Sequence, residues 1–565
     1  MAAAAGSVGE AHDARPGPRD AGRRFSPAAW VTAGSALAGL ALGLLALGPG
    51  LLPGFLLSYD MVFVPSPRFD ATMFGLTGTL PRAVPSDAVV TALGQLLPAD
   101  VVQKGVLLAI FVLACAGAAR LLDGQPWPAR LAAGVFYAWN PYVAERLLIG
   151  QWALLLGYAG LPWVLAELTR WKAGASVPGR GGRLLLALLP AGVSGFAGLL
   201  ISALVAVPAA ALRRGGGWRD RATVLAATAG LLVLLSLPWL IPSLTHPVRT
   251  SPVGAALFAA RADTPFGTVG SVLALGGSWN AQTVPAGYSG AVTVFWLCLV
   301  VVALAGFLLR GRGRWPGAGP AAVIGLVLAL LGTFGPGLHL LESAIRDVAG
   351  FAVLRDGQQF VAPLAVVEAA GFGLAVAWVL RIARSPLREG RVVLATALVI
   401  APVLFLPGLA WGAADRLRPV EYPASWLTAR QIITADPHPG SVLLLPWASY
   451  RRPGWNHGEA VLDPWPLLLT RTVIWNDGVQ VGSVTLPPED PAAAALAGLI
   501  SSGRPLTARL SADGVRYVVI DAGPGAADGS VSAAARRAGS RWAHRVLPGC
   551  VVAYAAPGLV IYRIP

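Results

Sequence analysis

Long apolar runs separated by short polar stretches dominate residues 27–411. A helix needs about 20 apolar residues to cross a bilayer. A longer run, 184–212, carries small residues such as Gly195 near its middle. It is either one long helix or a hairpin of two short helices that returns to the same side. Simple spans are expected at 27–50, 101–119, 131–147, 151–169, 222–242, 291–309, 319–341, 358–380 and 391–411.

The positions of the arginines decide how the longer run folds. Arg15, Arg19, Arg23 and Arg24 precede the first span. Because basic residues are enriched in cytoplasmic loops, the N-terminus is expected in the cytoplasm. The later arginine-rich loops fall on the same side only if 184–212 is a hairpin. The sequence therefore predicts about 11 transmembrane helices, with the N-terminus inside and the C-terminus outside.

The chain becomes polar after the last apolar run. The tail contains strand-like segments at Ser441–Leu445, Val515–Asp521, Val551–Ala555 and Leu559–Ile564, and an alanine-rich helical segment at 491–500. Alternating and β-branched apolar residues of this kind are typical of strands. The expected fold class is an α-helical polytopic membrane protein with a small extracytoplasmic α/β domain. The expected parts are a cytoplasmic tail at 1–26, a membrane domain at 27–412 with outer loops at 51–100 and 243–290, and the α/β domain at 413–565.

The composition agrees with a membrane protein. Of the 565 residues, 55% are hydrophobic and only 13% are charged, with a mean hydropathy of +0.64. Soluble proteins carry about 25% charged residues, so a soluble enzyme, a disordered chain and a coiled coil are excluded. The net charge of +15 could indicate a nucleic-acid partner. Arginines in cytoplasmic loops explain it better, and no nucleic-acid partner is predicted.

Two acidic residues of the first outer loop are candidates for chemistry. Asp60 follows the first span closely and lies between Tyr59 and Met61, and Asp70 comes ten residues later. A carboxylate among apolar residues at the edge of a helix bundle can act as a general base or hold a divalent cation. The alternative is a solvated loop charge.

A second polar cluster lies in 135–163, at an outer turn. Asn140, followed by proline, interrupts a helix, and the charged residues Glu145 and Arg146 lie at the depth of the membrane interface. Charges there are costly unless they are paired or face a cavity. Arg146 could bind a lipid phosphate or pair with Glu145. The aromatic residues, Trp139 among them, could form an interfacial belt.

A third cluster, 349–371, leads into a late span. Arg355 and Asp356 lie at its mouth, Gln359 follows, and Glu368 lies within the membrane. Arginine suits phosphate because its guanidinium can bond two oxygens. The alternative for the first two residues is a local ion pair, and for Glu368 a hydrogen bond to a neighbouring helix.

The tail has a polar and aromatic patch at 446–466. Aromatic faces next to amides and acids suit sugar binding, but the same residues could fill a loop-rich core. No phosphate-binding glycine loop, dinucleotide motif, nucleophile elbow or zinc spacing occurs in the sequence. These absences favour an enzyme that takes its substrate from the membrane.

The sequence resembles the GT-C superfamily of polyprenyl-phosphate-dependent glycosyltransferases in three features. They are the early acids Asp60 and Asp70, the passage ARLAAGVFYAWNP…GYAGLPW (129–163) and the segment AGFAVLRDGQQFVAPL (349–364). Within that superfamily, the last two resemble the membrane part of the actinobacterial α-(1→3)-arabinofuranosyltransferase. The resemblance implies a multi-pass enzyme of the bacterial plasma membrane. It would move arabinofuranose or mannose from a polyprenyl-phosphate donor to a cell-envelope polysaccharide or glycolipid.

The resemblance also implies roles for the residues. Asp60 would be the catalytic base with Asp70 in reserve, and Arg355 would bind the donor phosphate with Arg146 second. No metal site is assigned, although some members of the superfamily use Mg or Mn. The competing hypotheses are a flippase for lipid-linked sugars and an inactive envelope-assembly protein. The remaining expected substrate contacts are Asp356, Gln359, Glu145, Trp139, Asn140 and Glu368.

Overall fold

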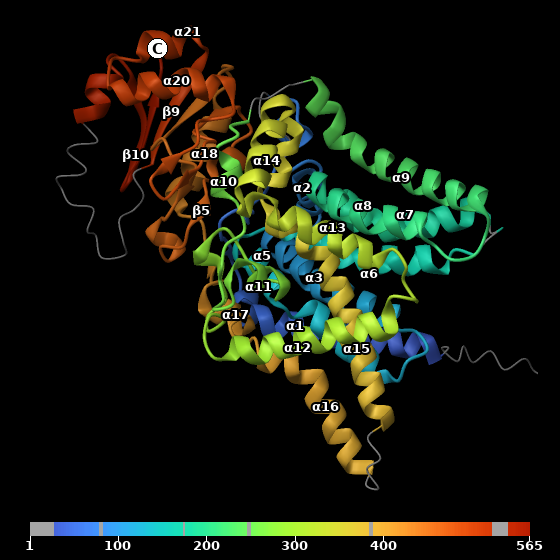
Figure 1. Ribbon diagram of the computed structural model, residues 1–565. Helices are drawn as coiled ribbons and strands as arrows, with labels where there is room; N and C mark the ends of the chain where they lie inside the picture. The colour runs from blue at the N-terminus through green and yellow to red at the C-terminus, as the bar shows by residue number, and fades with distance from the viewer. Residues whose placement is uncertain are drawn as a thin grey trace, which may run out of the picture.

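The computed structural model describes residues 27–77, 83–172, 174, 176–245, 250–382, 388–521 and 541–565, so the expected tail at 1–26 lies outside the described residues. A bundle of helices forms most of the molecule, and a sheet with its own helices packs at one end (Figure 1). The helices of the bundle are α1 Pro27–Leu47, α3 Ala99–Leu121, α4 Trp127–Ala138, α5 Pro141–Leu148, α6 Trp152–Arg170, α7 Val177–Ser194, α8 Phe196–Ala211, α9 Trp218–Thr245, α12 Val292–Gly306, α13 Ala318–Leu330, α14 Gly335–Asp347, α15 Ala362–Ile382 and α16 Arg388–Leu404.

Helix α15 is the centre of the bundle, and its apolar window is completely buried. It packs against α12, α4 and α13. Gly371 of α15 allows the closest approach, since a Cβ there would lie 1.9 Å from the carbonyl oxygen of Ala303 in α12. Small residues at a crossing let two membrane helices pack backbone to backbone.

Among the described residues, six helices are long and apolar enough to cross a membrane, or seven if a bent pair is one span. The prediction of about 11 spans is therefore not confirmed. The run 131–147 is divided between α4 and α5, and the run 319–341 bends by 93° between α13 and α14. Hydropathy cannot show these breaks, because the residues around them stay apolar.

The run 184–212 folds as the expected hairpin. Helix α7 ends at Ser194, and α8 begins at Phe196. Gly195 joins them with a φ of +79°, a conformation that favours glycine. Arg213, which follows α8, donates a hydrogen bond to the carbonyl oxygen of Trp171, which precedes α7. Both ends of the pair therefore lie on the same side of the bundle.

The chain beyond the bundle forms a five-stranded mixed sheet in the order β10-β11-β9-β3-β6. Strand β3 runs parallel to β6 and β9, whereas β11 runs antiparallel to β9 and β10. The four predicted strands and the predicted helix are all present. The elements are α18 Ala424–Ala435, β3 Ser441–Leu445, β6 Val473–Ile474, α20 Pro491–Ser502, α21 Thr507–Ala512, β9 Val515–Asp521, β10 Val551–Ala556 and β11 Leu559–Arg563.

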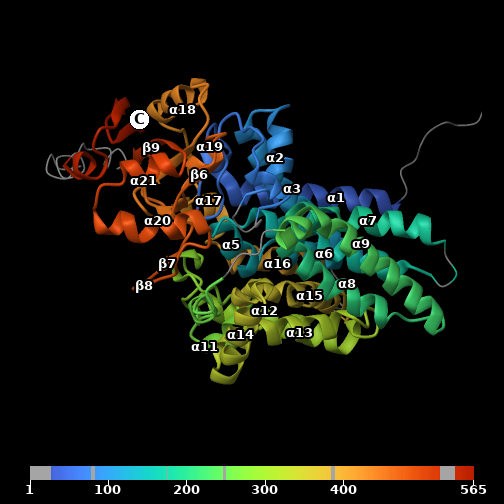
Figure 2. The ribbon, with the colours of Figure 1, turned by 90° about the horizontal axis from the view of Figure 1, so that it is seen from above.

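Successive side chains of β3 point to opposite faces of the sheet and so pack in two different hydrophobic cores. Val442 and Leu444 belong to the core that includes α18 and the bundle, whereas Leu443 and Leu445 pack in a second core with α20 and α21. The sheet thus lies between these helices at one end of the bundle (Figure 2), and the start of α1 lies at the opposite end.

Short segments connect the bundle to the sheet region. Strand β1, which follows α1, pairs antiparallel with β2. The shorter elements are β1 Phe55–Leu56, α2 Ser86–Gly94, α10 Gly254–Leu257, α11 Gly267–Leu273, α17 Ala410–Asp415, β2 Pro419–Val420, β4 Tyr450–Arg451, β5 Val461–Leu462, α19 Trp465–Leu468, β7 Gln480–Val481 and β8 Val484–Thr485, with 3-10 segments η1 Gly48–Leu51, η2 Thr72–Phe74, η3 Ala281–Thr283, η5 Leu331–Thr333, η6 Ala349–Arg355, η7 Gly357–Val361 and η8 Gly454–Asn456 and a π segment η4 Phe307–Gly311.

Candidate active site

Asp60 lies in a tight turn that directly follows β1. The turn is closed by the Ser58–Met61 backbone pair, and the Asp60 amide donates to the carbonyl oxygen of Ile149 at 3.1 Å. Gly150 has a φ of +84°, and a Cβ there would lie 2.1 Å from the Ser58 carbonyl oxygen. Only glycine lets the turn press this closely against the junction of α5 and α6.

Two side chains from distant parts of the sequence hold the Asp60 carboxylate. The Tyr450 hydroxyl, from β4, donates to Oδ1 at 2.5 Å. The Gln151 amide nitrogen, at the start of α6, lies 3.4 Å from Oδ2. The carboxylate is thus positioned where the segment after β1, the α5–α6 junction and the C-terminal region meet. Asp60 therefore differs from a solvated loop charge.

Arg146 is the centre of a buried polar network next to this carboxylate. Its guanidinium forms a two-pronged ion pair with Asp356, at 2.5 and 2.9 Å. Its remaining bonds go to the side-chain oxygens of Gln358 at 2.6 Å and Gln151 at 2.5 Å. Because Gln151 also faces Asp60, a chain of polar contacts joins Asp60 to Asp356.

The ion pairs considered from the sequence are not the ones found. Arg146 pairs with Asp356 rather than with its neighbour Glu145. Glu145 is buried and accepts a hydrogen bond from the Gln358 amide at 3.1 Å. Arg355 pairs with Glu489 of the C-terminal region, at 3.7 Å. Each pair crosses between elements, so the network holds several segments together.

Arg355 lies at the end of η6, close to the C-terminal region. Its guanidinium stacks 4.8 Å from the ring centroid of Phe258, a cation–π arrangement. Its side chain is 15% exposed, compared with 2% for Arg146. Gln359 braces the same segment by donating to the carbonyl oxygen of Val353 at 2.5 Å. Arg355 is therefore the more accessible of the two arginines expected to meet phosphate.

The break between α4 and α5 orients this network. The Asn140 carbonyl caps α5 by accepting from the Val143 amide at 3.0 Å, and its amide nitrogen donates to the carbonyl oxygen of Tyr137 at 2.8 Å. Trp139 donates to the Leu406 carbonyl oxygen at 3.0 Å. Trp139 and Tyr142 are fully buried, so an interfacial belt is the wrong interpretation for them.

Two predicted acids lie apart from the Asp60–Arg146 network. Asp70 accepts from the amide of Met73, in the η2 segment, at 3.0 Å. Glu368 is fully buried in α15, and neither of its oxygens makes a hydrogen bond within the described part of the chain. The hydrogen bond to a neighbouring helix considered from the sequence is thus not seen there.

Part of the patch at 446–466 packs in the core. Trp455 and Trp465 both pack against Trp426 of α18. The Arg451 side chain is 9% exposed and forms ion pairs with Asp463 at 3.1 Å and Asp521 at 2.6 Å. These residues fix β4 to the sheet, and this places Tyr450 against Asp60.

Sequence reasoning missed two residues that contact Asp60. Gln151 follows the glycine of the α5–α6 junction, and this Gly-Gln-Trp turn could have drawn attention to it. Tyr450 is 390 residues from Asp60, and no local pattern links them. Within the described ranges, no three His, Cys, Asp or Glu side chains gather as metal ligands would.

Comparisons with known proteins place this arrangement in a wider fold. No protein-family model and no curated protein sequence matches the chain. Among solved structures, arabinofuranosyltransferase AftD from mycobacteria is similar, with a TM-score of 0.59 and 19% identity over 95% of this chain and 40% of that one. A structure of a variant of the same enzyme gives 0.57 and 19% over 95% and 41%. The chain has a GT-C fold.

The GT-C fold confirms the resemblance noted from the sequence at the level of architecture. The chain spans about 40% of the AftD chain, so activity and substrates do not follow from the likeness. At lower similarity, ArnT from Cupriavidus metallidurans, bound to undecaprenyl phosphate, aligns with a TM-score of 0.44 and 13% identity over 96% of this chain and 99% of that one. With its long apolar helices, the protein is a multi-pass membrane protein.

Proposed function

We propose that the protein is a membrane glycosyltransferase. It would transfer a sugar from a polyprenyl-phosphate donor to a glycan or glycolipid of the cell envelope, on the outer face of the plasma membrane. The observation that carries the proposal is the Asp60 carboxylate, held by Tyr450 and Gln151 where the C-terminal region meets a GT-C bundle.

In this proposal, Asp60 is the general base. It takes the proton from the acceptor hydroxyl as that oxygen attacks the anomeric carbon of the donor. The bond from the anomeric carbon to the phosphate oxygen breaks, and the lipid phosphate leaves with inversion at carbon. A carboxylate with a fixed orientation suits this step, because a base must reach the proton that it removes.

Arg355 would bind the departing phosphate, and Arg146 would act mainly through the residues it holds. Arg355 is the more exposed of the two, and an arginine can bond two phosphate oxygens. The guanidinium N–H groups of Arg146 already donate to Asp356, Gln358 and Gln151. It fixes Gln151 beside Asp60, and this couples the donor side of the site to the base.

Arabinofuranose is the first choice of sugar, because the similar solved fold belongs to an arabinofuranosyltransferase. Mannose is the second. The proposal assigns no metal site. Transfer measured with and without EDTA would show whether the enzyme requires Mg or Mn. The C-terminal sheet region would lie outside the cell, where its Tyr450 meets the outer loop.

The experiment compares transfer with translocation for the full chain in liposomes. Labelled polyprenyl-phosphate arabinofuranose and mannose are supplied with an extract of envelope acceptors. Label entering the polymeric fraction supports the proposal, and the productive donor identifies the sugar. Donor that crosses the bilayer without transfer would support a flippase, and neither activity with either donor would favour an assembly protein.

A further inference from the structure

Two buried carboxyl groups face each other beside the Arg146 network. Glu145 of α5 and Asp263, between α10 and α11, lie within hydrogen-bonding reach of one another. Glu145 is 1% exposed. Its Oε1 and the Oδ1 of Asp263 are both buried, and neither meets a hydrogen-bond donor within the described residues. Two ionised carboxylates in contact repel each other, so such a pair is stable when it holds one proton.

Among the described residues, no basic side chain forms an ion pair with either acid. Arg146 follows Glu145 in the sequence, but its hydrogen bonds go to Asp356 and to two glutamines. Tyr288 lies close to both acids, and its hydroxyl donates to a backbone carbonyl oxygen instead. Glu368 of α15 lies near Tyr288 and adds a further acid. Ionisation of both members would therefore leave two adjacent buried charges without an ion-pair partner.

The acid pair contacts the backbone of residues 277–282, here called the bridge segment. The amide of Gly277 donates to Oδ2 of Asp263 at 2.5 Å. The next amide, that of Ser278, faces the Glu145 carboxyl group. Two successive amides thus each meet one acid of the pair, and the pair holds the bridge segment against α5.

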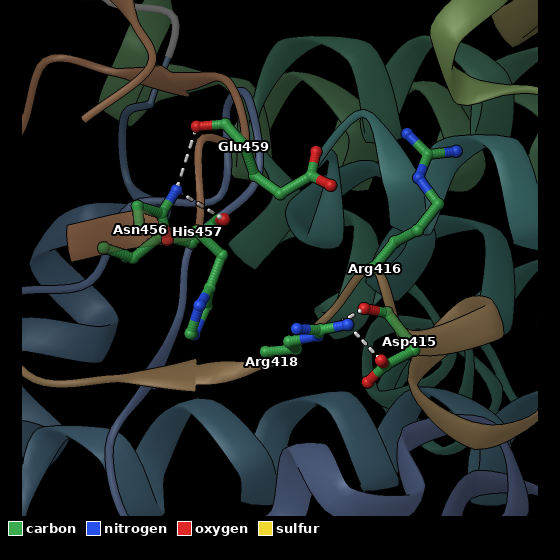
Figure 3. A pocket seen from close by; sticks show the side chains of 7 residues that line it. Asp415, Arg416, Arg418, Asn456, His457 and Glu459 are labelled. Atoms are coloured by element: carbon green, nitrogen blue, oxygen red, sulfur yellow. Dashed lines mark hydrogen bonds and ion pairs between the residues drawn. The ribbon is translucent and has the colours of Figure 1, made fainter. Parts of the chain in front are cut away.

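The bridge segment also contacts the turn that carries the proposed base. The side-chain oxygen of Gln282 accepts from the Tyr59 hydroxyl and from Arg452, both at 2.5 Å. Its carbonyl oxygen accepts from Arg416, whose guanidinium points away from the other arginine drawn in Figure 3. Because Tyr59 directly precedes Asp60, the bridge segment connects the acid pair to the surroundings of Asp60.

We propose that Glu145 and Asp263 share one proton, and that this proton holds the bridge segment against α5 beside the Asp60 turn. When the proton leaves, two negative charges lie side by side and the pair separates. Both acids are then positioning residues, and neither touches the reacting atoms. The effect on catalysis rests on the proposed function, but the proton and the bridge segment can be measured without glycosyl transfer, so the two proposals fail separately.

The shared proton determines how opening of the bridge segment depends on pH. In the open segment, both acids are solvated and titrate near the ordinary carboxyl pKa of about 4. The closed segment keeps a proton that the open segment loses, so the equilibrium constant for opening should rise about tenfold for each pH unit above about 5, until the pair itself ionises. Asp263→Asn places an amide N–H donor where the proton lies, so its opening should not depend on pH.

Hydrogen–deuterium exchange of the bridge segment tests this in the full-length protein in detergent, after correction for the intrinsic exchange rate. Between about pH 5 and about pH 8, wild type should lose protection by at least about tenfold relative to Asp263→Asn and Glu145→Gln. Asp347→Asn, an exposed acid at the end of α14, should behave as wild type. Parallel pH curves for wild type and both amide variants would overturn the proposal.

Infrared spectroscopy reports the proton itself, because a protonated carboxyl group has a C=O stretching band that a carboxylate lacks. At neutral pH, Asp263→Asn and Glu145→Gln should each lose the same band. Glu368→Gln, which alters a buried acid outside the pair, should keep that band. Melting curves confirm that the variants fold. If neither folded amide variant loses a carboxylic-acid band, the two acids share no proton and the proposal is refuted.

Discussion

The hydrogen bond from Tyr450 to Asp60 gives the sharpest prediction. Tyr450→Phe removes only the hydroxyl, and the ring keeps its packing against Tyr59, whose centroid is 6.0 Å away. Asp60 keeps its backbone bond to Ile149 and its neighbour Gln151. The variant should therefore fold normally and lose one contact of the proposed base.

The expected loss follows from the geometry of this contact. A hydrogen bond to a charged group contributes about 1.5–3 kcal/mol, and each 1.36 kcal/mol corresponds to about a factor of ten in rate. We expect kcat/KM to fall by about 10- to 100-fold. Because the hydroxyl favours the charged form of the carboxylate, the acidic limb of the pH–rate profile should move to higher pH.

The assay is transfer of labelled polyprenyl-phosphate arabinofuranose by the full-length protein in liposomes, measured from pH 5 to 9. Tyr554→Phe, the same substitution in β10 of the sheet, is the matched control and should behave as wild type. A Tyr450→Phe variant with the wild-type rate and pH profile would show that this contact does not position the base.

Three further predictions follow from other contacts. Gly150→Ala places a Cβ 2.1 Å from a carbonyl oxygen of the turn that carries the proposed base, so transfer should fall sharply while the helical circular-dichroism signal stays unchanged; a fully active variant would contradict the assignment. Burial, followed by a neighbouring carboxylate, raises the pKa of Asp87 from 3.8 to about 7. The folded state then binds this proton more tightly than the unfolded chain, and stability falls as the pH rises from about 4 to 7. Asp87→Asn should melt above wild type at pH 8 but not at pH 4, and parallel pH curves would count against this reasoning. Asp356→Asn leaves the buried Arg146 without its counter-charge; breaking such a pair costs about 3–5 kcal/mol, so the melting temperature should drop, whereas Asp513→Asn in an exposed pair should have little effect.

The sequence predicted the elements that depend on local patterns. The strand segments of the tail were predicted from strand-like apolar patterns and the hairpin at 184–212 from the positions of the arginines, and the structure has both. Asn140 followed by proline indicated the helix break at α5. The count of about 11 spans is not confirmed, because hydropathy reports how apolar a run is and not whether the run stays straight. The bend of 93° after α13 is an example.

The contacts of the candidate site could not be predicted, because they depend on tertiary pairing. Neighbouring charges such as Glu145 and Arg146, or Arg355 and Asp356, invite local pairing in a sequence, yet each arginine pairs with a carboxylate from another element. Tyr450 reaches Asp60 only because the buried Arg451 cluster fixes β4 to the sheet. The hydrophobic periodicity of a sequence does not indicate contacts between side chains that lie far apart along the chain.

Transfer by Asp60→Asn tests the central claim most directly. Wild type, Asp60→Asn and Asp347→Asn, an exposed acid at the end of α14, are compared at equal amounts of folded protein in liposomes with the productive donor. A general base contributes about 10²–10⁴-fold to a rate, so Asp60→Asn should lose at least about 100-fold while Asp347→Asn keeps the wild-type rate. Wild-type transfer by Asp60→Asn would contradict the account.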